Sequence, residues 1–185
     1  MIFRQPVFGA AVFREKVLMS KTALRVASLS LTAAFACGLA GSADAQLVAR
    51  KDISAAMALT MAETAIATCK ANGYNVSANV VGRSGEVIVA MRGDNTGPHT
   101  LENSMKKAYT ARAQRRSSGD FGDSIKDNFT AGALHLTNIV TARGALPIKV
   151  GEDTIGAIGV SGAPGGDKDE VCAKAGIDKV ADELK

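Results

Sequence analysis

The residues best suited to ligand binding or catalysis lie between Met91 and Ala111. This segment carries one of the two histidines of the chain. His99 follows Gly97-Pro98, and because proline fixes its own φ, the loop holds the imidazole in a stiff setting. Imidazole is a common ligand of haem iron, and nearby cations can pair with haem propionates. A lone histidine is more often structural, so the residues alone leave ligation and a structural role both open.

Two other segments resemble functional sites, but the residues around them favour structural roles. His135 lies in an apolar stretch, 131–140, and we predict a buried, hydrogen-bonded side chain. The run Gly162–Gly166 follows a predicted strand and precedes a helix, as a phosphate-binding loop does. It lacks the P-loop ending and the dinucleotide spacing. Three carboxylates also fill the helix N-terminus that an anion would need, so we predict a tight turn with acidic capping; they are Asp167, Asp169 and Glu170.

Other kinds of site find little support. Neither Ser104 nor Ser161 lies in a Gly-x-Ser-x-Gly nucleophile elbow, and no carboxylate pair stands out for glycosidase chemistry. Cys-x-x-Cys and His-x-x-x-His spacings are absent, which argues against structural zinc. Cys69 and Cys172 can form one disulfide if the chain is exported, or can be two small buried hydrophobic residues. Cα atoms more than about 7 Å apart would exclude the bond.

The elements before His99 must position its loop. We predict a helix over Ile53–Asn72, capped by Asp52 and ended by Gly73, because apolar residues recur there at helical spacing. Val76–Val80 alternates apolar and polar residues, as a half-buried strand does. A turn at Gly82–Gly85 and a strand over Glu86–Arg92 complete an antiparallel hairpin that leads directly into the loop.

The elements after His99 must close the core. Thr100 is a suitable cap for a helix that directs Met105, Ala108, Tyr109 and Ala111 inward and breaks at 117–119. A short helix over Gly122–Thr130 follows, and Ala131–Val140 is ambiguous between helix and strand. The strands 146–150 and 154–160 flank a turn and form a second hairpin. A last helix runs from about Asp167 to Leu184.

The beginning of the chain is typical of an export signal. After Met19, which is a possible true start, come a basic stretch, an apolar run over Val26–Ala40 and the tripeptide Ala43-Asp44-Ala45. We predict residues 1–45 to be a signal peptide cleaved between Ala45 and Gln46, and residues 46–185 to be one domain, periplasmic or secreted. The alternative is an uncleaved amphipathic anchor.

The positive charge of the chain belongs mostly to this signal. The whole sequence has 22 basic and 18 acidic residues; without residues 1–45 these fall to 17 and 16, because that segment holds Arg4, Arg14, Lys16, Lys21, Arg25, Glu15 and Asp44. A nearly neutral domain with no Trp and only two Tyr has little to offer nucleic acid, so we expect no nucleic-acid partner.

Several ordered motifs between Val48 and Leu184 point to a known family. They are Val80-Val81-Gly82-Arg83-Ser84-Gly85, Arg92-Gly93-Asp94, Pro98-His99-Thr100, Lys107-Ala108-Tyr109-Thr110-Ala111, Leu146-Pro147-Ile148 and Ile155-Gly156-Ala157-Ile158-Gly159-Val160-Ser161-Gly162, followed by Asp169-Glu170. With them the chain resembles the GlcG/HbpS family of haem-binding proteins, related to the PduO C-terminal domain. Two departures can alter the ligand pocket: Gly82 replaces a common Asp, and Arg143-Gly144-Ala145 replaces a more glycine-rich segment.

The resemblance implies an α+β fold, with a central antiparallel sheet flanked by helices in a profilin-like layered arrangement, and a homo-oligomer. It also implies that haem or a related tetrapyrrole binds, for haem capture or haem/redox sensing, without dedicated catalysis. His99 is then the expected iron ligand. The remaining site residues would order the loop (Arg92, Asp94, Thr100), pair with propionates (Lys106, Lys107, Arg112) or contact the macrocycle (Met91, Met105, Tyr109, Phe121).

Two other functions stay open at this stage. The chain can be an enzyme, or an enzyme subunit, that acts on a small organic acid held by Arg92 and Thr100. It can also be a structural oligomerisation module without a ligand.

Overall fold

The computed structural model describes residues 47–127 and 132–185, so the predicted signal peptide and part of the predicted helix over Gly122–Thr130 lie outside the described residues. Every element described below lies within Ala49–Lys185. In chain order these elements are α2 (Ala55–Ala71), β1 (Ser77–Val81), β2 (Val87–Arg92), α3 (Thr100–Gln114), α4 (Ser118–Ser124), η2 (Gly132–His135), β3 (Ala145–Val150), β4 (Asp153–Ser161), α5 (Gly166–Lys179) and η3 (Ala181–Glu183). None of the described helices is long and apolar enough to cross a membrane.

The four strands form one antiparallel sheet in the order β2-β1-β4-β3. The two predicted hairpins, β1–β2 and β3–β4, are both present, and β1 joins them by pairing with β4 from Ser77↔Ser161 to Val81↔Ala157. The expected α+β fold is confirmed.

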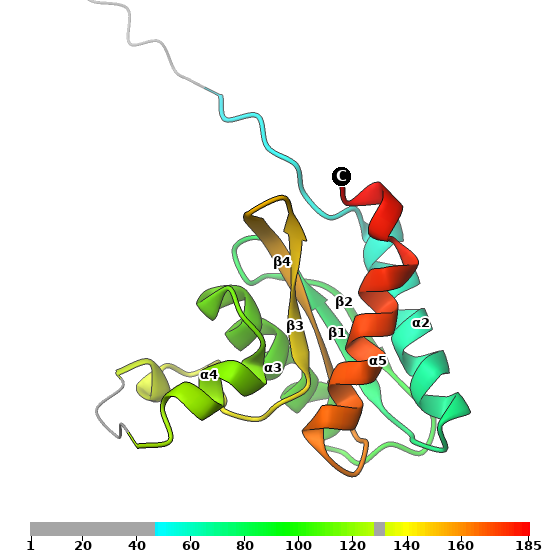
Figure 1. Ribbon diagram of the computed structural model, residues 1–185. Coiled ribbons are helices and arrows are strands. Elements are labelled where there is room, and N and C mark those ends of the chain that lie inside the picture. Colours follow the sequence, from blue (N-terminus) through cyan, green and yellow to red (C-terminus); the bar gives the residue numbers. More distant parts are fainter. Residues whose placement is uncertain (1–46, 128–131) are drawn as a thin grey trace, which may run out of the picture. The chain divides into compact units, whose positions relative to one another are not determined.

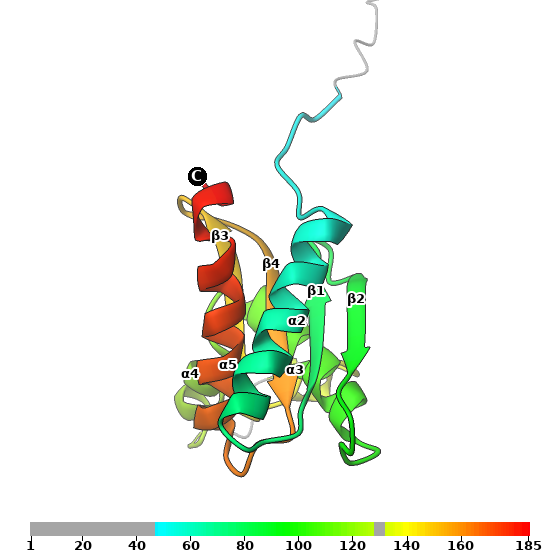
Figure 2. The ribbon, with the colours of Figure 1, turned by 90° about the vertical axis from the view of Figure 1, so that its right-hand side faces the viewer.

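Helices cover both faces of this sheet. α2 and α5 lie side by side on one face, and α3 crosses the other (Figures 1 and 2). Close approach depends on glycine: a Cβ on Gly159 of β4 would lie 2.7 Å from the Ala108 amide nitrogen of α3, and one on Gly176 of α5 would lie 2.6 Å from the Met61 carbonyl oxygen of α2.

The half-buried character predicted for the first strand is wrong. All five residues of β1 are buried, because the sheet is covered on both sides. The polar residues of β1 face α3 and bond to it. Ser77 Oγ lies 2.8 Å from Thr100 Oγ1, and Asn79 Nδ2 donates to the Leu101 carbonyl oxygen at 2.9 Å and to Ser104 Oγ at 2.7 Å. A polar position in a strand pattern can therefore mark a hydrogen bond to a covering helix instead of solvent.

The first helix begins later than predicted. Ser54, not Asp52, caps α2, since its Oγ accepts from the Met57 amide at 3.1 Å. Gly73 does follow the helix with φ +82°, as its predicted role after the C-terminus requires. Cys69 of α2 and Cys172 of α5 are joined in a disulfide, with Cα atoms 5.6 Å apart.

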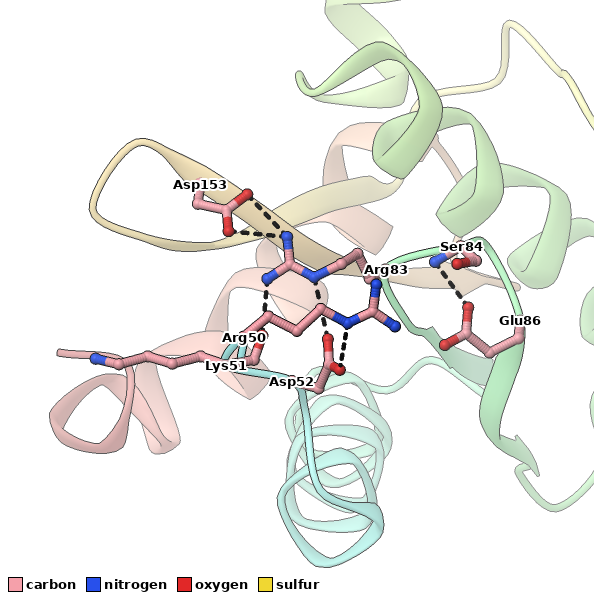
Figure 3. A network of polar contacts seen from close by, with 7 residues as sticks. All are labelled: Arg50, Lys51, Asp52, Arg83, Ser84, Glu86 and Asp153. Carbon is pink, nitrogen blue, oxygen red and sulfur yellow. Dashed lines mark hydrogen bonds and ion pairs between the residues drawn. The ribbon is translucent and has the colours of Figure 1, made fainter. Parts of the chain in front are cut away.

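Asp52 is instead part of an ionic network around Arg83 (Figure 3). The Arg83 guanidinium, from the β1–β2 turn, donates to Asp52 at 3.1 Å, to Asp153 at 2.8 and 3.0 Å and to the Lys51 carbonyl oxygen at 2.7 Å. One side chain thus ties the segment before α2 to both hairpin turns. The bond from Arg83 lowers the pKa of the Asp52 carboxyl group below its ordinary value.

Four further predictions need correction. Thr100 is the first residue of α3 and not its cap; its hydroxyl donates to the Gly97 carbonyl oxygen at 2.9 Å. α4 begins at Ser118, earlier than the predicted Gly122, because Ser117 Oγ accepts from the Asp120 amide. His135 is exposed at the end of η2, so the buried role predicted for it is wrong. The ends of the last helix shift slightly as well, because α5 stops at Lys179 and η3 follows.

Candidate functional site

A cavity of about 460 Å³ lies where three segments meet: the loop before α3, the segment before β3 and the loop from β4 to α5. Its walls are mainly polar, and the residues used below are His99, Asn103, Lys107, Arg143, Ser161 and Asp169. Ligand cavities of proteins commonly measure about 300–1,000 Å³. The cavity is therefore large enough to accept part of a cofactor or a small molecule.

His99 is the exposed histidine of this cavity. It occupies the N-cap position of α3, but its side chain makes no capping hydrogen bond. The ring rests on Gly97, where an added Cβ would lie 2.9 Å from His99 Cε1 and 3.1 Å from Nδ1. The missing side chain of Gly97 therefore makes room for the imidazole beside the cavity.

Arg92 holds the loop that carries His99. Its guanidinium donates to the carbonyl oxygens of Gly97 at 3.1 Å and Pro98 at 3.2 Å, and to Thr96 Oγ1 at 3.3 Å. Arg92 thus hydrogen-bonds to three residues of the loop. Asp94 makes no such bond to the loop among the residues that the structure describes: its carboxylate is 90% exposed and lies 3.9 Å from Lys70 Nζ.

A buried ion pair forms one wall. Lys107 Nζ donates to Asp169 Oδ2 at 2.8 Å and to the Val160 carbonyl oxygen at 3.0 Å, and both charged side chains are only 4% exposed. Asp169 Oδ1 accepts from the Ala163 amide at 3.0 Å. Burial raises the pKa of the Asp169 carboxyl group, and the Lys107 ammonium opposes that rise. The Lys107 ammonium is already engaged inside the protein, which argues against the propionate role predicted for it.

Arg143 is the cation at the rim of the cavity. Its guanidinium donates to Glu170 Oε2 at 3.0 Å and to Asp123 Oδ2 at 2.7 Å, and the side chain is 35% exposed. Glu170 and then Asp123 raise the pKa of the guanidinium, which stays charged. Deeper in, Asn103 Nδ2 donates to Ser161 Oγ at 3.0 Å. Residue chemistry missed Arg143 as a site residue; its only signal was the departure from the family pattern at 143–145.

The other predicted site residues do not join this cavity. Arg92 and Asp94 line a separate hollow of about 180 Å³ together with Met91, and Tyr109 and Arg112 line a third, of about 140 Å³. Lys106 pairs with Glu102 of the preceding turn. Phe121 is buried beneath the Arg116 guanidinium, and Met105, half-buried, lines none of the three hollows. Of the predicted set, only His99, Thr100 and Lys107 meet.

The cavity offers one imidazole and no multidentate metal site. Within residues 47–127 and 132–185, no group of three or more His, Cys, Asp or Glu side chains is arranged to hold a metal ion. A metal at this place would therefore have to bring most of its own ligands, as the iron of a tetrapyrrole does.

Comparison with known sequences gives consistent matches. The sequence profile of a family described as "Haem degrading protein HbpS-like" matches residues 53–178. An uncharacterized 15.0 kDa protein from the dhaT-dhaS intergenic region of Citrobacter freundii is 30% identical over 129 residues, which cover 68% of this chain and 90% of that protein.

Solved structures give the same fold. A double mutant of Streptomyces reticuli HbpS has a TM-score of 0.70 at 26% identity, over 76% of this chain and 94% of that one. Klebsiella pneumoniae protein ORFY has a TM-score of 0.67 at 25% identity, over 77% and 98% of the two chains. A haem complex of the PduO C-terminal domain, at 20% identity and a TM-score of 0.63 over 68% and 93% of the two chains, shares the fold.

Proposed function

The chain belongs to the HbpS-like family of haem degrading proteins, and from that premise we propose that it binds haem or a related tetrapyrrole at the cavity lined by His99. The observation that carries this proposal is the state of the His99 side chain. It is exposed beside a cavity of about 460 Å³, and no hydrogen bond joins its ring to the described residues. A ring nitrogen that accepts no hydrogen bond from the protein has its lone pair available to iron.

The residues around His99 suit the iron and one propionate of a haem. Haem iron would meet the imidazole, and Arg143 would meet a propionate, since only two of the five N–H donors of its guanidinium bond to Glu170 and Asp123. The walls contributed by Asn103 and Ser161 are polar, so this cavity suits the propionates better than the apolar macrocycle. We infer that the macrocycle remains partly outside the cavity.

Haem titration of residues 46–185 tests the proposal, and the chain supplies a matched control. We expect His99→Ala to shift the Soret band and to weaken haem binding at least about tenfold, as loss of an axial ligand should. His135→Ala removes the other histidine, which is exposed on η2, and should change neither quantity. An unchanged spectrum and affinity in His99→Ala would refute the role of His99.

A second variant tests position without removing the ring. In Gly97→Ala the new Cβ would overlap the imidazole, so the ring must turn from its present place. We expect weaker haem binding than in wild type with the circular dichroism spectrum unchanged. Full haem affinity in this variant would mean that the position of the ring beside the cavity is immaterial.

We also propose export, with cleavage before Gln46, and a homo-oligomeric state. The signal-like sequence of residues 1–45 supports export, and so does the Cys69–Cys172 disulfide, because such bonds persist in oxidising compartments. The exposed Val87 on edge strand β2 supports self-association. N-terminal sequencing of periplasmic or secreted material and light scattering of the purified protein test the two statements.

We propose haem capture or haem and redox sensing as the role, without a dedicated reaction. The description of the family favours haem degradation as the second candidate. Following the Soret band of the complex after addition of a reductant in air separates the two: a stable band supports capture or sensing, and a protein-dependent loss that requires His99 supports degradation. Turnover of a small organic acid without haem would instead favour the enzyme alternative.

A further inference from the structure

The hollow at the far end of α3 is separate from the His99 cavity. It measures about 140 Å³ and lies between α3 and the β1–β2 turn, where it is lined by Arg83, Ser84, Gly85, Tyr109, Arg112 and Ala113. It shares no lining residue with the cavity of His99. His99 and Arg112 lie at opposite ends of α3, roughly 20 Å apart along the helix axis at 1.5 Å per residue. One haem edge cannot occupy both sites.

Arg112 stands out in this hollow because it lacks a partner. Its Nε is buried and makes no hydrogen bond, and in the described parts of the chain no carboxylate lies within ion-pair distance of its guanidinium. By contrast, Arg83 and Arg143 each pair with two carboxylates. Buried polar atoms are satisfied in the great majority of cases, so an orphaned Arg Nε–H indicates an absent acceptor.

The charges around Arg112 favour an anion. Burial lowers the pKa of its guanidinium, and the nearby cations Arg115 and Arg83 lower it further, although the carboxylates of Asp153 and Glu86 oppose this in part. Arg83 would contribute little to binding an anion, because its guanidinium already pairs with the carboxylates of Asp52 and Asp153. The acidic group on this turn, Glu86, accepts from the Ser84 amide at 2.8 Å.

The remaining walls are closely packed and carry donors. A Cβ on Gly85 would lie 2.6 Å from Tyr109 Cε2, and Gly85 has φ +82°, so glycine is required both for the turn and for the aromatic ring beside it. Tyr109 and Ser84 each bring a hydroxyl that can donate to an oxyanion. The site is thus built from one helix and one tight turn.

We propose that this hollow binds the carboxylate group of a small molecule, held side-on by Nε–H and an Nη–H of Arg112, with a hydroxyl donated by Tyr109 or Ser84. Arg and carboxylate commonly pair through two parallel hydrogen bonds, and this geometry uses the orphaned Nε–H. At about 30 Å³ for each water-sized group, the hollow holds roughly five non-hydrogen atoms. The site goes beyond haem binding and does not depend on it.

The test follows the Arg112 Nε–H signal by nuclear magnetic resonance in ¹⁵N-labelled protein of residues 46–185. Sodium acetate is titrated against sodium chloride at matched ionic strength. We expect acetate, but not chloride, to shift the Arg112 signal saturably and to slow its exchange with water, with a Kd on the order of millimolar for so small a ligand. The same protein titrated with haem in parallel should keep this response.

Variants separate a built site from general positive charge. Arg112→Lys keeps the charge but removes the Nε–H, and should weaken acetate binding at least about tenfold. Arg115→Gln removes a nearby cation and should weaken acetate binding clearly less than Arg112→Lys, because Arg115 does not line the hollow and contributes only its charge. Tyr109→Phe should cause an intermediate loss if its hydroxyl donates.

Several outcomes would overturn the proposal. Absence of a saturable acetate shift in wild type would do so without any variant. An equal loss in Arg115→Gln would reduce the effect to general charge. Much tighter binding of inorganic phosphate than of acetate would assign the hollow to a phosphate group. A shift of the Arg112 signal with protein concentration alone would assign it to a carboxylate of a second copy of the chain.

Discussion

Removal of the Cys69–Cys172 disulfide should destabilise the domain by several kilocalories per mole. The bond joins residues separated by 103 positions, and it therefore restricts most of the unfolded domain. For a closed loop of about 100 residues, the chain-entropy relation gives about 4.7 kcal/mol at 25 °C, within the range of about 2–5 kcal/mol seen when native disulfides are removed. Domains of this kind are stable by about 5–15 kcal/mol, so the loss would be a large part of the total.

Urea unfolding of residues 46–185, followed by circular dichroism, measures this loss. The perturbation is Cys69→Ala combined with Cys172→Ala, since both residues are buried and serine would bury a hydroxyl group. With an m value of about 2 kcal/mol/M, a loss of about 4.7 kcal/mol moves the urea midpoint down by roughly 2 M. Reduced wild-type protein should move in the same direction, because it also lacks the crosslink.

Comparing oxidised wild type, reduced wild type and the double alanine variant separates the effect of the crosslink from that of the packing of the two sulfur atoms. Oxidised wild type should be the most stable, and the reduced wild type and the double alanine variant should lie close together below it. A difference of less than about 1 kcal/mol between oxidised and reduced wild type would refute the loop-entropy reasoning. It would mean that the α2–α5 packing is already held without the bond.

Three further predictions concern buried contacts and the ionic network. Arg83→Gln should return the pKa of Asp52 toward its ordinary value, and nuclear magnetic resonance titration of the carboxyl group measures the change. Because that pKa is lowered in the folded protein, the wild type has the associated stability above about pH 4 and loses it as the pH falls. Lys107→Met should cost about 3–5 kcal/mol in urea unfolding, because it leaves the Asp169 carboxylate buried without its cation. Gly159→Ala should cost at least about 1–3 kcal/mol in the same assay, since the added Cβ meets the backbone of α3.

Each of these predictions has a matched control. An Asp52 titration that is the same in Arg83→Gln as in wild type would show that Arg83 does not set that pKa. Replacing Asp169 by Asn as well as Lys107 by Met should recover part of the loss, because no unpaired charge then remains buried. Gly132→Ala, whose Cβ would meet nothing within 4 Å, should leave the unfolding free energy within about 0.5 kcal/mol of wild type.

Local patterns predicted most elements of this fold. Helical spacing of small apolar residues located α2, and glycine-rich turns between β-rich runs located both hairpins, because these signals act over a few neighbouring residues. Cap positions were less well predicted. Asp52 and Ser54 are both good capping residues, and the choice between them depends on Arg83, which arrives from a distant turn.

The sequence could indicate only the local parts of the candidate site. The loop through Pro98 that presents His99, and the role of Arg92 in ordering it, depend on residues within one short segment. The grouping of His99 with Arg112 was wrong, although helix geometry alone places them at opposite ends of α3. The exposed position of His135 was missed because an apolar neighbourhood in sequence does not ensure burial in space.

The sequence by itself determined most helices and strands, the loop before α3 and the residues able to bind a ligand. Secondary-structure propensity and hydrophobic periodicity are short-range properties, so they can be read from neighbouring positions. Only the tertiary structure decided which of those residues meet. The sheet order β2-β1-β4-β3 brings Arg143, Ser161 and Asp169 to the loop of His99. It also engages Lys107 in a buried ion pair and, among the described residues, leaves Arg112 without one. Such pairings depend on the packing of segments far apart in the chain, which no local pattern specifies.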